Sequence, residues 1–207
     1  MKRLTLTVLF LGLLLAAAPT AFAQTAAAPA ATPAAPTAGF RAEALNELAG
    51  LEQRFLSLAQ AVPPEKYTWR PAEGVRSISE VYMHVAGANY ALPRLVGVAP
   101  PAAFNPRGFD TSVTEKAKVI DALRQSFAHV RQAVLNMPDA DGEKKVKLFG
   151  ADNTYRGVLV FIIRHMAEHL GQSIAYARMN GVTPPWTEEQ QQRVQQQQQL
   201  QKEKPKQ

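Results

Sequence analysis

Residues 154–181 read TYRGVLVFIIRHMAEHLGQSIAYARMNG, and this stretch decides the fold. We predict a helix that begins near Thr154 and ends at Asn180–Gly181, because Gly after the last turn is a common C-terminal stop. Pro184 and Pro185 lie just beyond it, where proline commonly follows a helix end. Residues 158–163 are apolar all round, so we expect this helix to be the most buried one.

Three further helices are predicted before this stretch. The earliest ends at Pro63–Pro64, and its apolar residues recur at three- and four-residue steps: Leu45, Leu48, Phe55, Leu58 and Val62. The other two follow capping boxes at 77–80 and 112–115, in which Ser and a Glu three residues later satisfy free amides at a helix start. The second helix carries Ile78, Val81, Val85, Ala88 and Leu92. The third stops at Pro138 and carries Ile120, Leu123, Phe127, Val130, Val134 and Met137.

Four amphipathic helices with a common interior predict an all-α protein, a four-helix bundle. The connection between the third and fourth helices, residues 145–149, is predicted to form a short strand or hairpin. The bundle spans residues 39–186, which is about the usual size of one domain.

The two ends of the chain have other compositions. Residues 1–23 are predicted to be a signal peptide, with Lys2 and Arg3, an apolar run and an Ala21-Phe22-Ala23 cleavage site. The alternative is an uncleaved membrane anchor, but the apolar run is shorter than the roughly 20 residues that span a bilayer. Residues 24–38 are an Ala- and Pro-rich linker, expected to be disordered, and residues 187–207 are a Gln-rich solvated tail. The protein is therefore expected to be exported, periplasmic or secreted, without stable membrane insertion after cleavage.

Composition excludes several functions. The chain has no Cys, which rules out disulfides, Cys-ligated zinc, iron–sulfur clusters and a Cys nucleophile. The net charge is +6, and removing Lys2 and Arg3 leaves 6 − 2 = +4. This charge is mild and forms no long run. The Lys-rich group at 144–147 lies beside Glu143, so a solvated loop is favoured over an anion site.

We expect the histidines of the chain to form its functional site. His165 and His169 are four residues apart on the fourth helix and therefore share one face. His84 falls on the interior face of the second helix, between Val81 and Ala88, where an imidazole needs a polar partner. One divalent metal ion would satisfy all three rings, and the alternative is a buried hydrogen-bond network of His and water. His129 is predicted to face solvent, outside the site, because it lies about 200° round the helix from Phe127.

Three neutral imidazoles suit zinc, nickel, iron or copper. They also leave at least one coordination position for water or substrate, as in catalytic zinc sites. A second motif overlaps this one, because residues 165–169 fit the H-x-x-E-H pattern of inverted zinc peptidases, with Glu168 as general base. Those enzymes take a third ligand far downstream, and only 38 residues follow here, so we favour Glu168 as a helix surface residue or a partner of a metal ligand.

Two segments resemble the DinB-like family. The first runs from Trp69-Arg70-Pro71-Ala72-Glu73 through the 77–80 capping box to Met83-His84. The second is the run 165–172, His-Met-Ala-Glu-His-Leu-Gly-Gln, followed by Tyr176, Arg178, Asn180-Gly181 and Pro184-Pro185. The match covers about residues 40–186. It implies an up-down-down-up four-helix bundle, frequent homodimers, and a divalent metal, such as zinc, nickel or iron, on His84, His165 and His169.

The resemblance implies function more loosely. Similar proteins include metal-dependent thiol-S-transferases and maleylpyruvate isomerases, and the family's link to DNA damage concerns induction, so no nucleic-acid partner is expected. Thiol cofactors of that kind are cytosolic, and export therefore argues against thiol transfer. We expect an exported metalloenzyme, a hydrolase or transferase, that acts on a small molecule.

Two further residues are candidates for catalysis in that site. Gln172 lies close to the face of His165 and is a candidate for orienting a ligand or bound water, with an interhelical hydrogen bond as the alternative. Tyr176 follows one turn later and offers a hydroxyl, with a core aromatic as the alternative. No carboxylate lies at an obvious general-base spacing, which keeps open a non-catalytic metal- or ligand-binding module.

Overall fold

The computed structural model describes residues 35–203, with side chains up to Gln199. The predicted signal peptide and most of the predicted linker lie outside the described residues. Within them the chain forms five α-helices and one two-stranded hairpin: α1 (Gly39–Ala61), α2 (Ile78–Ala91), α3 (Lys116–Asn136), β1 (Lys145–Leu148), β2 (Ala151–Thr154), α4 (Tyr155–Met179) and α5 (Pro185–Glu203). Short 3₁₀ helices occupy Pro64–Lys66, Leu92–Val96, Phe109–Thr111 and Asp139–Glu143.

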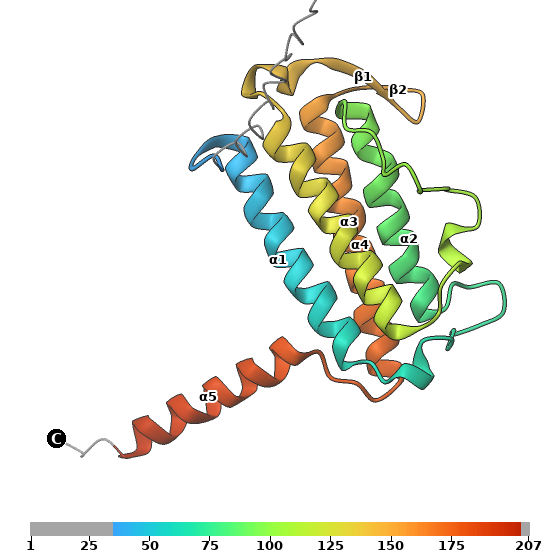
Figure 1. Cartoon of the computed structure of the whole chain (residues 1–207). Coiled ribbons are helices and arrows are strands. Elements are labelled where there is room, and N and C mark those ends of the chain that lie inside the picture. Colours follow the sequence, from blue (N-terminus) through green and yellow to red (C-terminus); the bar gives the residue numbers. More distant parts are fainter. Residues whose placement is uncertain (1–34, 204–207) are drawn as a thin grey trace, which may run out of the picture. The chain divides into compact units, whose positions relative to one another are not determined.

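Helices α1 to α4 form the predicted all-α bundle. Figure 1 shows α2 and α3 running in one direction and α1 and α4 running in the other, which is the up-down-down-up order. Two parallel helices that follow each other in sequence need a long connection, and residues 92–115 provide it; we call this segment the crossover. The β1–β2 hairpin, with Lys145 opposite Thr154, confirms the strand predicted before the fourth helix.

All four bundle helices contribute to the core. Phe55 of α1 contacts Tyr82 of α2 and Phe127 of α3, with ring centroids 6.2 and 5.7 Å apart. Ile162 and Met166 of α4 are fully buried beside them in the same cluster. Each such side chain contributes about 1.5–3 kcal/mol on burial, so the core fixes the positions of α2 and α4.

The most buried helix is α2, and the expectation that it would be the fourth helix is wrong. Ten of the 14 residues of α2 are buried, against eight of the 25 in α4. The crossover covers the outer side of α2, where Phe109 packs against Gly87. More of α4 is exposed, and its Val160 is 52% exposed.

One of the two predicted capping boxes is confirmed. The Ser77 side chain accepts from the Glu80 amide, and the Glu80 carboxylate accepts from the Ser77 amide at 2.8 Å. The box at 112–115 is wrong, because α3 begins at Lys116 and the Ser112 hydroxyl instead donates to the Phe109 carbonyl at 2.8 Å. Val113 packs against the core, so these residues close the crossover and the helix begins after them.

The limits of α4 agree with prediction. The Thr154 side chain accepts from the Gly157 amide at 3.1 Å, and Gly181 follows the helix with a positive φ of 75°. The Gln-rich segment forms α5 with exposed Gln side chains, and the guanidinium of Arg54 lies 5.9 Å from the ring of Trp186 near its start. None of the helices within the described residues is long and apolar enough to span a membrane.

Candidate metal centre

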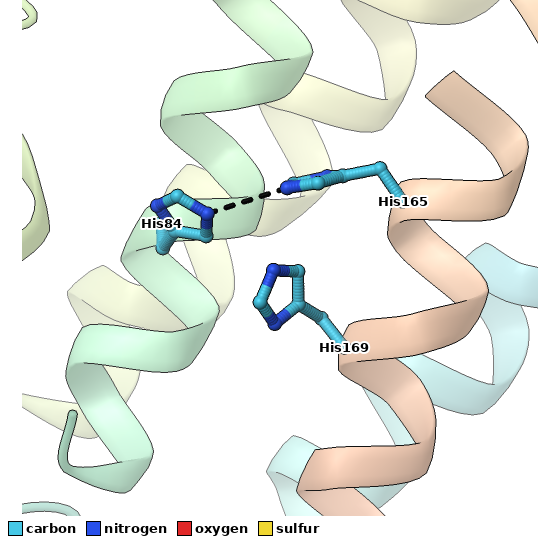
Figure 2. Close-up of side chains that lie close together, drawn as sticks. All are labelled: His84, His165 and His169. Carbon is cyan, nitrogen blue, oxygen red and sulfur yellow. Dashed lines mark hydrogen bonds between the residues drawn. The ribbon is translucent and has the colours of Figure 1, made fainter. Parts of the chain in front are cut away.

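Three imidazoles meet between α2 and α4. His84 lies in the middle of α2, and His165 and His169 lie one turn apart on α4. Figure 2 shows the three rings pointing toward one another. The Nε2 atoms of His84 and His165 are 3.3 Å apart, and one potential ligand atom from each residue lies within 4.8 Å of the others. The structure therefore brings together the three histidines that the sequence singled out.

A carboxylate holds the far side of the His84 ring. The Nδ1 atom of His84 lies 3.1 Å from Oδ2 of Asp110, which is on the crossover. The same carboxylate accepts a hydrogen bond from Arg76 Nε at 3.1 Å and forms an ion pair with Arg76 Nη2 at 3.0 Å. Sequence reasoning missed Asp110, because a single Asp in a loop 26 residues from His84 carries no spacing signal.

An amide holds the far side of the His169 ring. The Nδ1 atom of His169 lies 2.8 Å from Oε1 of Gln172, and Gln172 Nε2 donates to the Tyr176 hydroxyl at 2.9 Å. Both predicted residues are thus at the site, but they contact His169 and each other. The alternative of an interhelical bond for Gln172 is wrong, because residues three and four apart on α4 face one another. Tyr176 is 7% exposed and packs edge-on against Trp69, so it is also a core aromatic.

Two of the imidazoles, those of His165 and His84, favour their neutral forms. Burial, followed by the neighbouring His169 and His84, lowers the pKa of His165 to about 4. Burial and the charge of Arg76 also lower the pKa of His84, against a smaller opposing effect from Asp110. Because only a neutral imidazole has a free lone pair, these rings are available to a metal ion at neutral pH.

The donor set fits a divalent metal ion. Three imidazole nitrogens converge, and two of the rings have an outer partner of the kind that metal-binding histidines usually have. His165 Nδ1 is buried and has no hydrogen-bond partner within the described residues, so protein groups alone leave this cluster incompletely satisfied. Zinc, nickel and iron all accept such nitrogen ligands, which leave a coordination position open.

Two other predicted residues lie outside this cluster. Glu168 pairs with Arg164 at 2.9 Å and its side chain is 56% exposed, which leaves no general base in the H-x-x-E-H pattern. His129 does not face solvent as predicted. It is half-buried against Tyr90, at 5.6 Å between ring centroids, because Tyr90 packs on the crossover and extends the apolar surface beyond the bundle core.

The remaining charged groups near the hairpin carry no site. Lys144 pairs with Asp141 and Lys147 pairs with Asp152, both on exposed surface, as expected of a solvated loop. A pocket of about 620 Å³ adjoins the outer partners of two imidazoles: it is lined by Asp110 and Gln172 together with Arg70, Gly74, Val75, Arg76, Glu80 and Thr111. A small molecule in this pocket would contact Asp110 and Gln172, the outer partners of His84 and His169.

Comparison with known proteins places the fold. A DinB-like protein from Bacillus cereus superposes with a TM-score of 0.61 and 19% identity, over 69% of this chain and 93% of that one. A DinB-like protein from Bacillus subtilis superposes with a TM-score of 0.55 and 17% identity, over 68% of this chain and 93% of that one. A protein assigned to the DinB family from Exiguobacterium sibiricum superposes with a TM-score of 0.53 and 22% identity, over 70% of this chain and 95% of that one. No curated protein matched the chain.

A family model described as the DinB superfamily matches residues 47–173. This match spans most of the bundle and includes His84, His165 and His169. The chain belongs to the DinB superfamily.

Proposed function

We propose that His84, His165 and His169 bind one divalent metal ion and that the protein is a metal-dependent hydrolase or transferase acting on a small molecule. The observation that carries the proposal is the convergence of three ring nitrogens within 4.8 Å from two helices fixed by the core. Such an ion would lower the pKa of a bound water or substrate thiol and so supply a nucleophile at neutral pH.

The chain's own residues would admit and orient the small molecule. The pocket beside the rings is lined by the guanidinium groups of Arg70 and Arg76 and by the carboxylates of Glu80 and Asp110. Each carboxylate already accepts from an arginine, whereas each arginine has further N–H donors. A substrate with hydrogen-bond acceptors is therefore favoured in this pocket.

We also propose that the protein works outside the cytoplasm. The support is the sequence of residues 1–23, with its charged start, apolar run and Ala-x-Ala site. The mature chain is then expected to begin near Gln24, which mass spectrometry of protein isolated from its native host would test. An intact chain from Met1 recovered in the cytosol would contradict export.

One observation favours a second candidate, a metal- or ligand-binding module without turnover. In the described part of the chain, Asp110 is the only carboxylate hydrogen-bonded to the imidazoles, and it is already shared between His84 and Arg76. A free general base is therefore missing beside the rings.

Metal analysis combined with a substrate panel separates the two candidates. The purified protein would be stripped with a chelator, reloaded with zinc, nickel or iron singly, and assayed against ester, amide and thiol-transfer substrates. Turnover that disappears on stripping and returns with one metal supports the enzyme. Stoichiometric metal without turnover supports the module, and the absence of bound metal contradicts the enzyme and the metal-binding form of the module.

A further inference from the structure

We infer that Asp110 is a positioning residue for the metal site, and that it makes metal affinity depend on how the crossover packs against α2. Asp110 would keep the His84 proton on Nδ1 and so aim the Nε2 lone pair at the centre of the three rings. This inference rests on the proposed function, because it assigns a role toward the ion that the three imidazoles would bind.

The hydrogen-bond partners determine the His84 tautomer. An ionised carboxylate can only accept, so the 3.1 Å contact with Asp110 requires the proton on His84 Nδ1. The Nε2 atom, which faces His165 at 3.3 Å, then carries the lone pair. Without Asp110, the His84 ring is free to place its proton on Nε2, which blocks coordination by that atom.

A hydrogen-bond partner also determines the tautomer of His169, whereas the Nδ1 atom of His165 has no such partner in the described residues. Gln172 Nε2 donates to Tyr176, so its Oε1 accepts from His169 Nδ1 and leaves the His169 Nε2 lone pair free. Gln172 belongs to α4, whereas Asp110 comes from a different segment. Asp110 is therefore a residue from outside the two ligand helices that contacts a ligand ring directly.

The crossover is seated on α2 close to His84. A Cβ atom at Gly87 would lie 3.1 Å from Cδ1 of Phe109, the residue that precedes Asp110. Gly87 is three residues after His84 and so lies on a neighbouring part of the same helix surface. The absence of a side chain at Gly87 lets Phe109 pack closely against α2, and this packing positions Asp110 beside His84.

The first test compares Asp110→Ala with the wild-type protein, using Zn²⁺ as the probe. Loss of such an outer partner typically weakens metal affinity about 10- to 100-fold, which competition with a chromophoric chelator would measure. Asp110→Asn retains an acceptor and should fall between the two. Asp152→Ala, on the exposed end of the hairpin, is the matched control and should bind Zn²⁺ like the wild type.

A second readout on the same proteins needs no metal. Long-range ¹H–¹⁵N NMR of the metal-free protein reports which imidazole nitrogen carries the proton, with His84 assigned by comparison with His84→Ala. The wild-type and Asp152→Ala proteins should show His84 protonated on Nδ1, and Asp110→Ala should show Nε2 protonation. Unchanged tautomer or unchanged Zn²⁺ affinity in Asp110→Ala would overturn the inference.

A further variant, Gly87→Ala, alters neither a ligand nor Asp110. Alanine is the better helix former by about 1 kcal/mol, so an affinity loss would not come from a weakened α2. We expect Zn²⁺ affinity to fall, by less than in Asp110→Ala, because Phe109 must move. In an Asp110→Ala background the same change should have no further effect, and full additivity would overturn the coupling.

The outcomes distinguish this inference from the proposed function. A wild-type protein that binds no Zn²⁺ would refute the metal site, while the tautomer of His84 would still test the role of Asp110. Tight binding through the three histidines with no effect of Asp110→Ala would refute the inference alone.

Discussion

In the described residues, half-buried imidazoles pack between helices at two places, and only one of these places has the features of a metal site. His129 of α3 lies against Tyr90 of α2, and its Nε2 atom is buried with no hydrogen-bond partner in the described residues. Burial lowers its pKa, as it lowers that of His165. Burial and a lowered pKa therefore do not distinguish a metal site.

The difference lies in what surrounds each ring. Tyr90, the neighbour of His129, packs in turn on Phe104 and Phe109, which offer no metal ligands. At the other place three imidazoles converge, and Asp110 and Gln172 orient two of them from behind. Convergent lone pairs with outer partners are the feature that indicates a metal ion there.

The largest effect should come from deleting a ligand. His84→Ala, His165→Ala and His169→Ala are each expected to lose most bound metal, because two remaining protein ligands are too few for a tight site. His129→Ala is the matched control and should keep a full equivalent. Metal content of the dialysed proteins, measured by plasma mass spectrometry, decides between them. Equal losses of bound metal in the His129 and His165 variants would contradict the claim that only the three-histidine cluster binds metal.

A smaller effect is expected from the hydrogen bonds behind His169. Gln172→Leu should lower Zn²⁺ affinity about tenfold, because the His169 ring loses its fixed tautomer and orientation. Tyr176→Phe should have a weaker effect in the same direction, since the hydroxyl only holds the amide of Gln172. Chelator competition would measure both, with the exposed Gln132→Leu as control. Wild-type affinity in Gln172→Leu would show that the amide has no part in the site.

The smallest effect concerns acid stability of the metal-free protein. The folded pKa of His165, about 4, lies below the ordinary unfolded value of about 6.5, so below pH 6.5 the unfolded chain takes up a proton that the folded chain excludes. The free energy of unfolding should therefore fall between pH 7 and pH 5. Urea unfolding of His165→Leu should show a shallower fall than the wild type.

The same measurement on His129→Leu sharpens the comparison. The pKa of His129 is lowered by burial alone, whereas that of His165 is lowered also by two neighbouring imidazoles. We therefore expect the His129 variant to flatten the pH dependence less. A larger flattening in His129→Leu than in His165→Leu would contradict the electrostatic description of the cluster.

Sequence patterns predicted the parts of this structure that depend on helical spacing. The apolar repeats, the Ser77–Glu80 box and the Thr154 and Gly181 boundaries are local, and the three histidines follow from their register on α2 and α4. A helical register relates each residue to the bundle axis, and this is sufficient to bring His84 to His165 and His169.

Most errors and omissions involve the crossover; the exception is the interhelical hydrogen bond considered for Gln172, whose partners lie on its own helix. The packing of the crossover on α2 makes that helix the most buried one and covers Tyr90, the neighbour of His129. Within the crossover, Ser112 closes a turn and Asp110 contacts His84. None of these contacts leaves a periodic signal, because the crossover contains only short 3₁₀ helices and most of the contacts join residues far apart in sequence. A pattern read along one helix cannot show what a loop places on its outer face.

The central claim is that the convergent imidazoles, and not the isolated one, hold a metal ion. A crystal structure of the zinc-loaded protein, with anomalous diffraction recorded on both sides of the zinc absorption edge, tests it most directly. We expect one strong peak about 2.0–2.1 Å from a ring nitrogen of each of His84, His165 and His169, and none beside His129. A fully loaded crystal with its peak elsewhere, or with no peak among the three rings, would contradict the claim.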